Sequence, residues 1–276
     1  MQDIKMIICD LDGTLLTPDE TVSRRNQEAF LAAQAKGVAV AIATGRSQIE
    51  AQEAIRAIHC DLYGIFIAGS QVFDLARRRF LYRELLDPQK CLAMVSIADE
   101  YPDAYFHLYH SNELYSSAHC RELIFDCRFT GPYIEFLKES LLTYPSLPEY
   151  LRQTGFTGEK LYIYGEGNTI GEIQERISQI DGLEIASPMP NSIEITSAGV
   201  NKGRAIQQLL RHMKVQAENV MGIGDSENDL PMFANVGFRV AMGNAYSCLK
   251  EQADYIAPDY REDGVADAIE KFVLCS

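Results

Sequence analysis

An apolar run near the start of the chain stops at a pair of carboxylates. Lys5 to Cys9 is typical of a buried strand, and the pentapeptide DLDGT at 10–14 follows it, with Asp10 and Asp12 two positions apart. Alternate side chains of an extended segment reach the same side. One carboxylate can therefore attack phosphorus or bind a metal ion while the other handles a proton. Asp-rich turns also occur after strands without any function, so the pentapeptide alone leaves both interpretations open.

A second acidic cluster follows another apolar run. Asn219 to Gly224 is typical of a buried strand, and it leads into the hexapeptide GDSEND, which carries Asp225 and Asp229. Carboxylate oxygens without soft ligands nearby suit Mg²⁺. The alternative is an acidic helix start, where the helix dipole favours Asp and Glu. The position of Asp225 directly after the strand favours the metal site.

Two further segments could hold an anion. The tripeptide Thr44-Gly45-Arg46 lies where an apolar run gives way to a helical pattern. A hydroxyl and backbone N–H groups at such a turn make an anion site. Lys202 opens a predicted helix, although the helix dipole favours a lysine at the opposite end. This placement indicates a task such as holding phosphate, and a solvated surface lysine is the alternative.

Composition limits the partners of the chain. Its 276 residues carry a net charge of −14, which repels nucleic acid and anionic membranes, so we expect neither as a partner. The seven cysteines are scattered and form no C-x-x-C, which argues against a disulfide framework or a zinc site and favours a reducing, cytoplasmic setting. We expect no signal peptide, and no apolar run reaches the ~18 residues of a membrane span.

Strand and helix patterns alternate at both ends of the chain, which predicts a parallel sheet with helices on its faces. The middle differs, because its strands are aromatic and alternating, as in Ala104–Tyr109 and Lys160–Tyr164. The predicted elements of the two ends are strands at 5–9, 38–43, 62–68, 219–224, 237–241 and near Tyr255, and helices at 23–35, 47–58, 202–213, 230–234 and from Asp263.

We therefore expect an α/β fold with two domains. A doubly wound, Rossmann-like parallel-sheet core would comprise residues 1–81 and 191–276, and an inserted α/β cap would comprise residues 82–190. Arg77–Arg79 would lie in a hairpin near the entry to the insertion, and Ser187–Pro190 would mark the return. Ligands of open parallel sheets bind beyond the carboxyl ends of the strands, where Asp10, Thr44 and Asp225 would converge.

Taken in this order, the segments DLDGT, TGR, Lys202 and GDSEND resemble the haloacid dehalogenase superfamily of phosphotransferases. The short stretch between Asp12 and Thr44 leaves no room for a cap domain. The long insertion between Thr44 and Lys202 is similar to that of the Cof-type sugar-phosphatase branch, whose cap is an α/β lid. The resemblance covers the core motifs by sequence and the cap by position and size. One departure is Ala68-Gly69-Ser70, where family members often carry Asn-Gly, and it leaves one polar contact in doubt.

The resemblance implies a role for each matching residue. Asp10 would be the nucleophile that becomes aspartyl-phosphate, and Asp12 would protonate the leaving group and then activate water. The remaining roles would be phosphate binding by Thr44, Lys202, Asn228 and the backbone N–H groups of Leu11 and Gly45, Mg²⁺ binding by Asp10, Asp225 and the backbone carbonyl of Asp12, and support of the metal site by Asp229.

The resemblance, together with these residues, implies a Mg²⁺-dependent phosphatase for small phosphorylated metabolites, in particular sugar phosphates. The alternatives are a phosphomutase of the same superfamily and a phospho-acceptor regulator without turnover. The cap shows no arginine cluster for the second phosphate of a mutase, and a regulator needs neither Asp12 nor a lid. In the insertion, His107 and His110 could line a substrate pocket. A metal site with His119 and Cys120 is a weaker alternative, because no recognised ligand spacing is present.

Overall fold

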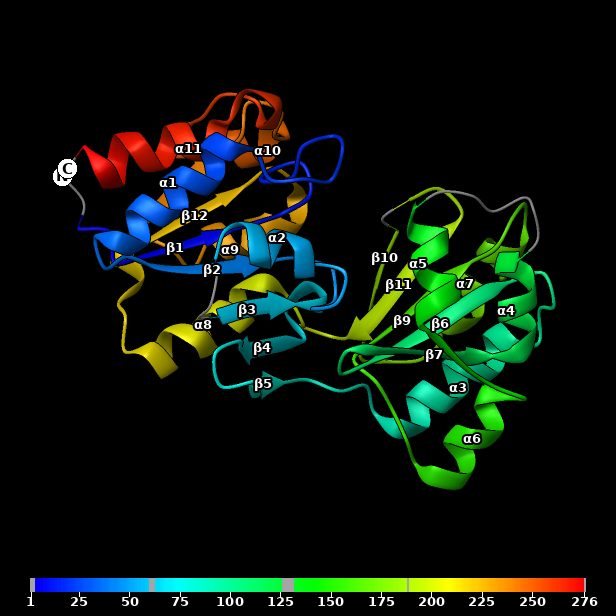
Figure 1. Cartoon of the computed structure of the whole chain (residues 1–276). Coiled ribbons are helices and arrows are strands. Elements are labelled where there is room, and N and C mark those ends of the chain that lie inside the picture. The colour runs from blue at the N-terminus through cyan, green and yellow to red at the C-terminus, as the bar shows by residue number, and fades with distance from the viewer. Residues whose placement is uncertain (1–2, 60–62, 126–131, 188, 276) are drawn as a thin grey trace. The chain divides into compact units, whose positions relative to one another are not determined.

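The computed structural model describes residues 3–59, 63–125, 132–187 and 189–275 (Figure 1). The chain divides into two compact units, the first comprising Met1–Arg83 and Asn201–Ser276 and the second comprising Glu84–Val200. Leu62, with which the predicted third strand begins, lies outside the described residues, as do Cys60, Cys127 and Pro188. No helix of the described residues is long and apolar enough to cross a membrane.

The first unit is built on an eight-stranded sheet in the order β14-β13-β12-β1-β2-β3-β4-β5. The strands from β14 to β3 pair in parallel, and β4 and β5 extend the sheet as an antiparallel hairpin. The strands are β1 (Met6–Cys9), β2 (Ala39–Ala43), β3 (Tyr63–Phe66), β4 (Gln71–Asp74), β5 (Arg79–Arg83), β12 (Val220–Gly224), β13 (Phe238–Ala241) and β14 (Tyr255–Ile256). The predicted hairpin around Arg77–Arg79 is confirmed.

Helices cover both faces of this sheet. Figure 1 shows α1 and α11 on one face and α8 on the other, with α1 packed on α11 and α8 packed on α9. The α-helices are α1 (Arg24–Ala35), α2 (Gln52–Ala57), α8 (Lys202–Met213), α9 (Leu230–Phe233), α10 (Ser247–Lys250) and α11 (Gly264–Ile269). The predicted doubly wound α/β core is therefore confirmed.

The helix after β2 starts later than predicted. The prediction began it at Ser47, whereas α2 begins at Gln52. The backbone N–H and the hydroxyl of Ser47 both donate to the Glu50 carboxylate, at 2.7 and 2.6 Å. Side-chain hydrogen bonds of this kind compete with the hydrogen bonds of a helix. The segment from Ser47 to Ala51 therefore forms turns, and the helix begins only at Gln52.

The second unit has a six-stranded sheet in the order β10-β11-β9-β6-β7-β8. Its strands are β6 (Tyr105–His110), β7 (Glu113–Ser117), β8 (Leu141–Tyr144), β9 (Lys160–Tyr164), β10 (Leu183–Ala186) and β11 (Ser192–Ser197). Its helices are α3 (Pro88–Asp99), α4 (Ala118–Phe125), α5 (Pro132–Ser140), α6 (Leu147–Thr154) and α7 (Thr169–Ile177).

Both predicted domain boundaries differ from the divisions between the units. The prediction ended the insertion at residue 190, but β11 pairs with β9 and β10 and the second unit continues to Val200. Pro190 lies in a turn before β11, and the chain beyond it still belongs to the sheet of the second unit. At the entry, β5 continues to Arg83, two residues beyond the predicted end of the core.

Candidate active site

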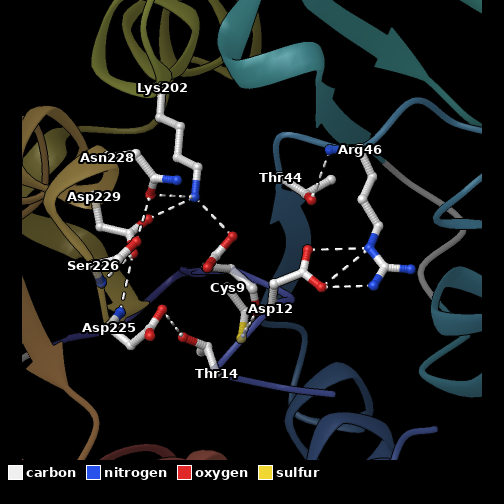
Figure 2. Close-up of polar contacts among 11 residues, drawn as sticks. Cys9, Asp12, Thr14, Thr44, Arg46, Lys202, Asp225, Ser226, Asn228 and Asp229 are labelled. Carbon is white, nitrogen blue, oxygen red and sulfur yellow. Dashed lines mark hydrogen bonds and ion pairs between the residues drawn. The ribbon is translucent and has the colours of Figure 1, made fainter. Parts of the chain in front are cut away.

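Three neighbouring strands bring the predicted site residues to one edge of the first sheet. β1 pairs in parallel with β2 on one side and with β12 on the other, so that Cys9 lies beside Ile42 and Ile223. Their carboxyl ends therefore lead into Asp10, Thr44 and Asp225 at the same edge. Figure 2 shows Thr44 and Asp225 there. The predicted convergence of these three segments is confirmed. The residues of β1 are fully buried, which fixes the strand and with it the start of the Asp10 loop.

Lys202 at the start of α8 lies in the middle of this cluster. Its Nζ donates to Asp10 Oδ1 at 2.7 Å, to Asp229 Oδ1 at 2.6 Å and to Asn228 Oδ1 at 3.2 Å (Figure 2). The side chain is 1% exposed, so the alternative of a solvated surface lysine is wrong. Asn201 caps the helix by accepting a hydrogen bond from the Arg204 N–H, and thereby fixes the position of the lysine beside it.

In this cluster, burial and the neighbouring opposite charges shift the pKa values of Asp10 and Lys202 in opposite directions. Burial raises the pKa of the Asp10 carboxyl, and the positive charge of Lys202 opposes that rise. Burial also lowers the pKa of Lys202, but Asp10 and Asp229 together raise it above its ordinary value. The ammonium group therefore stays charged and supplies a local positive field, which the acidic chain otherwise lacks.

Asp225 and Asp229 have different surroundings. Asp229 Oδ2 accepts hydrogen bonds from the backbone N–H groups of Asp225 and Ser226, and its other oxygen accepts from Lys202. Ser226 and Asp229 form a capping box, so the helix-start interpretation holds for Asp229. Asp225 instead accepts a hydrogen bond from the Thr14 hydroxyl at 3.3 Å. Burial, with the nearby Asp229 charge, raises the pKa of Asp225 to about 6.

A group of carboxylates suited to a metal ion lies within this cluster. Ligand atoms of Asp10, Asp225 and Asp229 all lie within 4.8 Å of one another, and no other such group of three occurs among the described residues. Gly13 leaves room beside them, because a Cβ there would lie 2.4 Å from Asp225 Oδ2, and its φ of +72° is one that residues with a Cβ rarely adopt. An all-oxygen ligand set fits a hard divalent cation such as Mg²⁺.

Asn244 is a further residue of the site. Its Nδ2 donates to the Gly13 carbonyl at 2.8 Å and lies 3.4 Å from Asp225 Oδ2. Its Oδ1 accepts a hydrogen bond from the Tyr260 N–H. Asn244 therefore ties the loop after β1 to the carboxylate after β12. Its position beyond β13, the strand next to β12, is the signal that could have identified it.

Asp12 is turned away from the lysine cluster and toward Arg46 (Figure 2). The Arg46 Nε lies 3.2 and 3.0 Å from the two oxygens of Asp12, and Nη2 lies 2.6 Å from Oδ1. The side chain of Asp12 is 55% exposed, whereas that of Arg46 is 24% exposed. The sequence placed Arg46 in the TGR segment but gave no reason to expect this pairing.

The other predicted phosphate-binding residues lie around the same strand ends. Leu11 follows Asp10 and Gly45 follows Thr44, so both backbones lie beyond neighbouring strands. Thr44 is fully buried, and its hydroxyl accepts a hydrogen bond from the Arg46 N–H. Asn228 reaches the cluster through its contact with Lys202 and accepts a further hydrogen bond from the Ser226 hydroxyl.

The described histidines of the second unit do not belong to any group of three possible metal ligands. His107 is fully buried, its Nδ1 lies 2.9 Å from the Tyr105 hydroxyl, and burial lowers its pKa to about 3. His110 bonds to the backbone carbonyl of Thr157. His119 lies 3.5 Å from the Cys120 sulfur, but the described residues offer no third ligand there.

Comparison with known proteins gives a family. The model of the haloacid dehalogenase-like hydrolases matches residues 7–269. The chain is 31% identical to the 5-amino-6-(5-phospho-D-ribitylamino)uracil phosphatase YcsE of Bacillus subtilis, over 99% of this chain and 97% of that protein. It is 24% identical to the pyridoxal phosphate phosphatase YbhA of Escherichia coli, over 96% and 97% of the two chains.

A solved structure has the same fold. The crystal structure of a haloacid dehalogenase-like hydrolase from Bacteroides thetaiotaomicron matches with a TM-score of 0.84 at 24% identity, over 97% of this chain and 99% of that one. The solved structure shows the fold, whereas the family model and the curated relatives also show the family and the phosphatase activity. The chain therefore belongs to the haloacid dehalogenase-like hydrolase family and is an enzyme of its phosphatase branch.

Proposed function

We propose that this phosphatase hydrolyses small phosphorylated metabolites in a Mg²⁺-dependent reaction, through a covalent phosphate on Asp10. The observation that carries the proposal is the buried contact between Asp10 and Lys202, at 2.7 Å. A carboxylate at a strand end, held by a buried cation, is oriented for attack on phosphorus and lies in a local positive field. Phosphoryl transfer depends mainly on such positioning and charge neutralisation.

In the first step, an oxygen of Asp10 attacks phosphorus and the bond from phosphorus to the leaving oxygen breaks. Asp12 in its protonated form gives its proton to that oxygen, so the leaving group departs as an alcohol. Lys202, Thr44, Asn228 and the N–H groups of Leu11 and Gly45 hold the transferred phosphoryl group. Lys202 neutralises part of its negative charge.

In the second step, Asp12 accepts a proton from water while the water oxygen attacks phosphorus. The bond between phosphorus and the Asp10 oxygen breaks, inorganic phosphate leaves, and the Asp10 carboxylate is restored. Each turnover returns both carboxylates to their starting states.

Mg²⁺ would be held by Asp10, Asp225 and the backbone carbonyl of Asp12. Asp229 would support the site by accepting a hydrogen bond from the backbone N–H of Asp225. When bound, the ion supplies positive charge to the phosphate oxygens. The acidic group and the space that Gly13 leaves beside Asp225 support this assignment.

Mg²⁺ binding should weaken below about pH 6. The folded, metal-free protein keeps a proton on Asp225 up to the raised pKa of about 6, whereas the unfolded chain loses it near its ordinary value. The metal-free fold is therefore stabilised by this group at low pH, and loses that stabilisation as pH rises through 6. Mg²⁺ must displace the proton, so its dissociation constant should rise by about tenfold per pH unit below 6. Calorimetric titrations with Mg²⁺ at pH 5 and pH 7.5 test this, and equal constants would contradict it.

The substrate class is small phosphate monoesters, in particular sugar phosphates. By its name, the 31% identical relative acts on a phosphate ester of a ribityl chain, and a second relative acts on pyridoxal phosphate. Both names describe small phosphorylated metabolites. Among the described residues, Cys91 and Cys120 are buried free thiols, which supports a reducing, cytoplasmic setting.

Phosphate release from a panel of phosphorylated metabolites tests the proposal. The panel should hold sugar phosphates, a phosphorylated ribityl compound and pyridoxal phosphate, each with Mg²⁺ and with EDTA. We expect release with Mg²⁺, a loss of at least about 100-fold with EDTA, and recovery when Mg²⁺ is returned. Release that EDTA does not change would remove the metal from the proposal. Transfer of labelled phosphate to another position of the substrate, without release, would indicate a mutase.

A further inference from the structure

The ion pair between Arg46 and Asp12 joins two loops of the site. Arg46 follows β2 and Asp12 follows β1, and the guanidinium contacts both carboxylate oxygens at 2.6 to 3.2 Å (Figure 2). A planar guanidinium that meets a carboxylate in this way fixes its orientation as well as its charge. Asp12 is more than half exposed, so without Arg46 its carboxylate would be free to rotate in solvent.

Arg46 is itself held in place. Its backbone N–H donates to the Thr44 hydroxyl at 3.1 Å, and its carbonyl accepts from the Ile67 N–H at 3.0 Å. Its side chain is mostly buried although it carries a charge. The other acidic neighbour, Glu20, lies 3.5 Å from Nη1 and is 67% exposed, which makes it a weaker partner than Asp12. The geometry of Arg46 is therefore directed at Asp12.

We propose that Arg46 is a positioning residue for the proton transfers of Asp12. It sets the orientation of the Asp12 carboxylate relative to the reacting phosphate, and it contacts neither the phosphate nor the metal ion. This inference rests on the proposed role of Asp12. It goes further by assigning the arginine of the TGR segment to Asp12, whereas the threonine and the glycine before it are assigned to phosphate.

The dependence of rate on the leaving group distinguishes this role from a structural one. A simple alkyl phosphate has a poor leaving group that needs a proton, whereas p-nitrophenyl phosphate has a good one that does not. Arg46→Gln should lower kcat/KM for the alkyl ester by about 10- to 100-fold, because positioning accounts for part of the gain from general acid catalysis. For p-nitrophenyl phosphate the change should stay within about threefold. A merely structural loss, or a lost phosphate contact, would lower both rates together.

The double variant Asp12→Asn/Arg46→Gln gives the second test. If Arg46 acts through Asp12, the double variant should turn over the alkyl ester at the same rate as Asp12→Asn alone. If the rate loss of the double variant equals the product of the losses of the two single variants, then Arg46 acts independently of Asp12 and the inference is overturned. Arg46→Lys keeps the charge but loses the two-point contact, and it should fall between the native enzyme and Arg46→Gln. It also preserves the test if Arg46→Gln does not fold.

Two controls isolate the contact. Glu20→Gln removes the other acidic neighbour of Arg46 and should leave the ratio of the two rates unchanged, as should Arg24→Gln, which removes an exposed arginine paired with Glu28. Failure of the inference differs from failure of the proposed function. If Asp12→Asn itself shows no greater loss on the alkyl ester, then the role of Asp12 is wrong. If Asp12→Asn shows it and Arg46→Gln does not, then only the positioning role is wrong.

Discussion

Replacing Asp10 with Asn should lower the rate of phosphate release by about 10⁴-fold or more and leave the fold intact. Asn has the shape of Asp but cannot act as the nucleophile, so no covalent phosphate forms. Lys202 would keep Asp229 as a partner at 2.6 Å, so we expect the free energy of unfolding to fall by less than about 2 kcal/mol. The rate is measured as phosphate release, and the fold by circular dichroism and thermal unfolding.

Asp74→Asn is the matched control for this variant. Asp74 is also a nearly fully buried carboxylate of the first unit, and it pairs with Arg77 at 3.0 Å in the β4–β5 hairpin. Its loss should cost some stability and leave phosphate release at the native rate. A normal rate in Asp10→Asn would show that the covalent mechanism is wrong. Trapping labelled phosphate on the native protein, and its absence from Asp10→Asn, would add direct support.

The second large effect is expected from Lys202→Met, which should impair both activity and stability. Met fills a similar volume, but Asp10 and Asp229 would then face each other in a buried site without a cation. Breaking a buried pair by removing one partner costs about 3–5 kcal/mol. Phosphate release should also fall by about 10²- to 10³-fold, because the lysine would stabilise the charge of the transferred phosphoryl group. Thermal unfolding and phosphate release measure the two effects.

Lys160→Met separates these two effects. Lys160 lies in the second unit, is 2% exposed, and pairs with Glu194 at 2.6 Å, so it is a buried lysine with a carboxylate partner outside the proposed site. Its loss should destabilise the protein while p-nitrophenyl phosphate is still hydrolysed. If Lys202→Met lowers stability but not activity, then Lys202 is structural and the proposed phosphate site is wrong.

Local pattern predicted the core of this protein well. The apolar runs that end at Asp10, Thr44 and Asp225 form parallel strands, because a strand buried on both faces has to be apolar throughout. The helix predicted at 23–35 is α1, and Ser23 caps it by accepting a hydrogen bond from the Asn26 N–H. The position of Lys202 at the end of a helix that is unfavourable for its charge indicated a task such as holding phosphate, and the structure buries the lysine against Asp10.

The missed contacts depend on geometry that sequence spacing does not contain. Asn244 reaches the Gly13 carbonyl across 231 positions, and Arg46 reaches Asp12 only because β1 and β2 are neighbours with a fixed register. The predicted boundary at residue 190 differs from the end of the second unit at Val200, because β11 continues the sheet beyond Pro190. In that strand Ile193 and Ile195 are buried, and such alternation is typical of an antiparallel sheet.

The first unit is formed from two segments that the ribosome makes before and after the whole second unit. Asp10 and Lys202 are 192 positions apart, and the whole second unit is made between them. While the chain emerges from the ribosome, β1 can pair with β2 but must wait for β12, so one of its edges stays open. Open edges of this kind invite pairing with other chains. We therefore expect nascent or truncated chains that stop before α8 to be inactive and prone to aggregation, whereas the second unit can complete its own sheet before the catalytic carboxylate receives its cation.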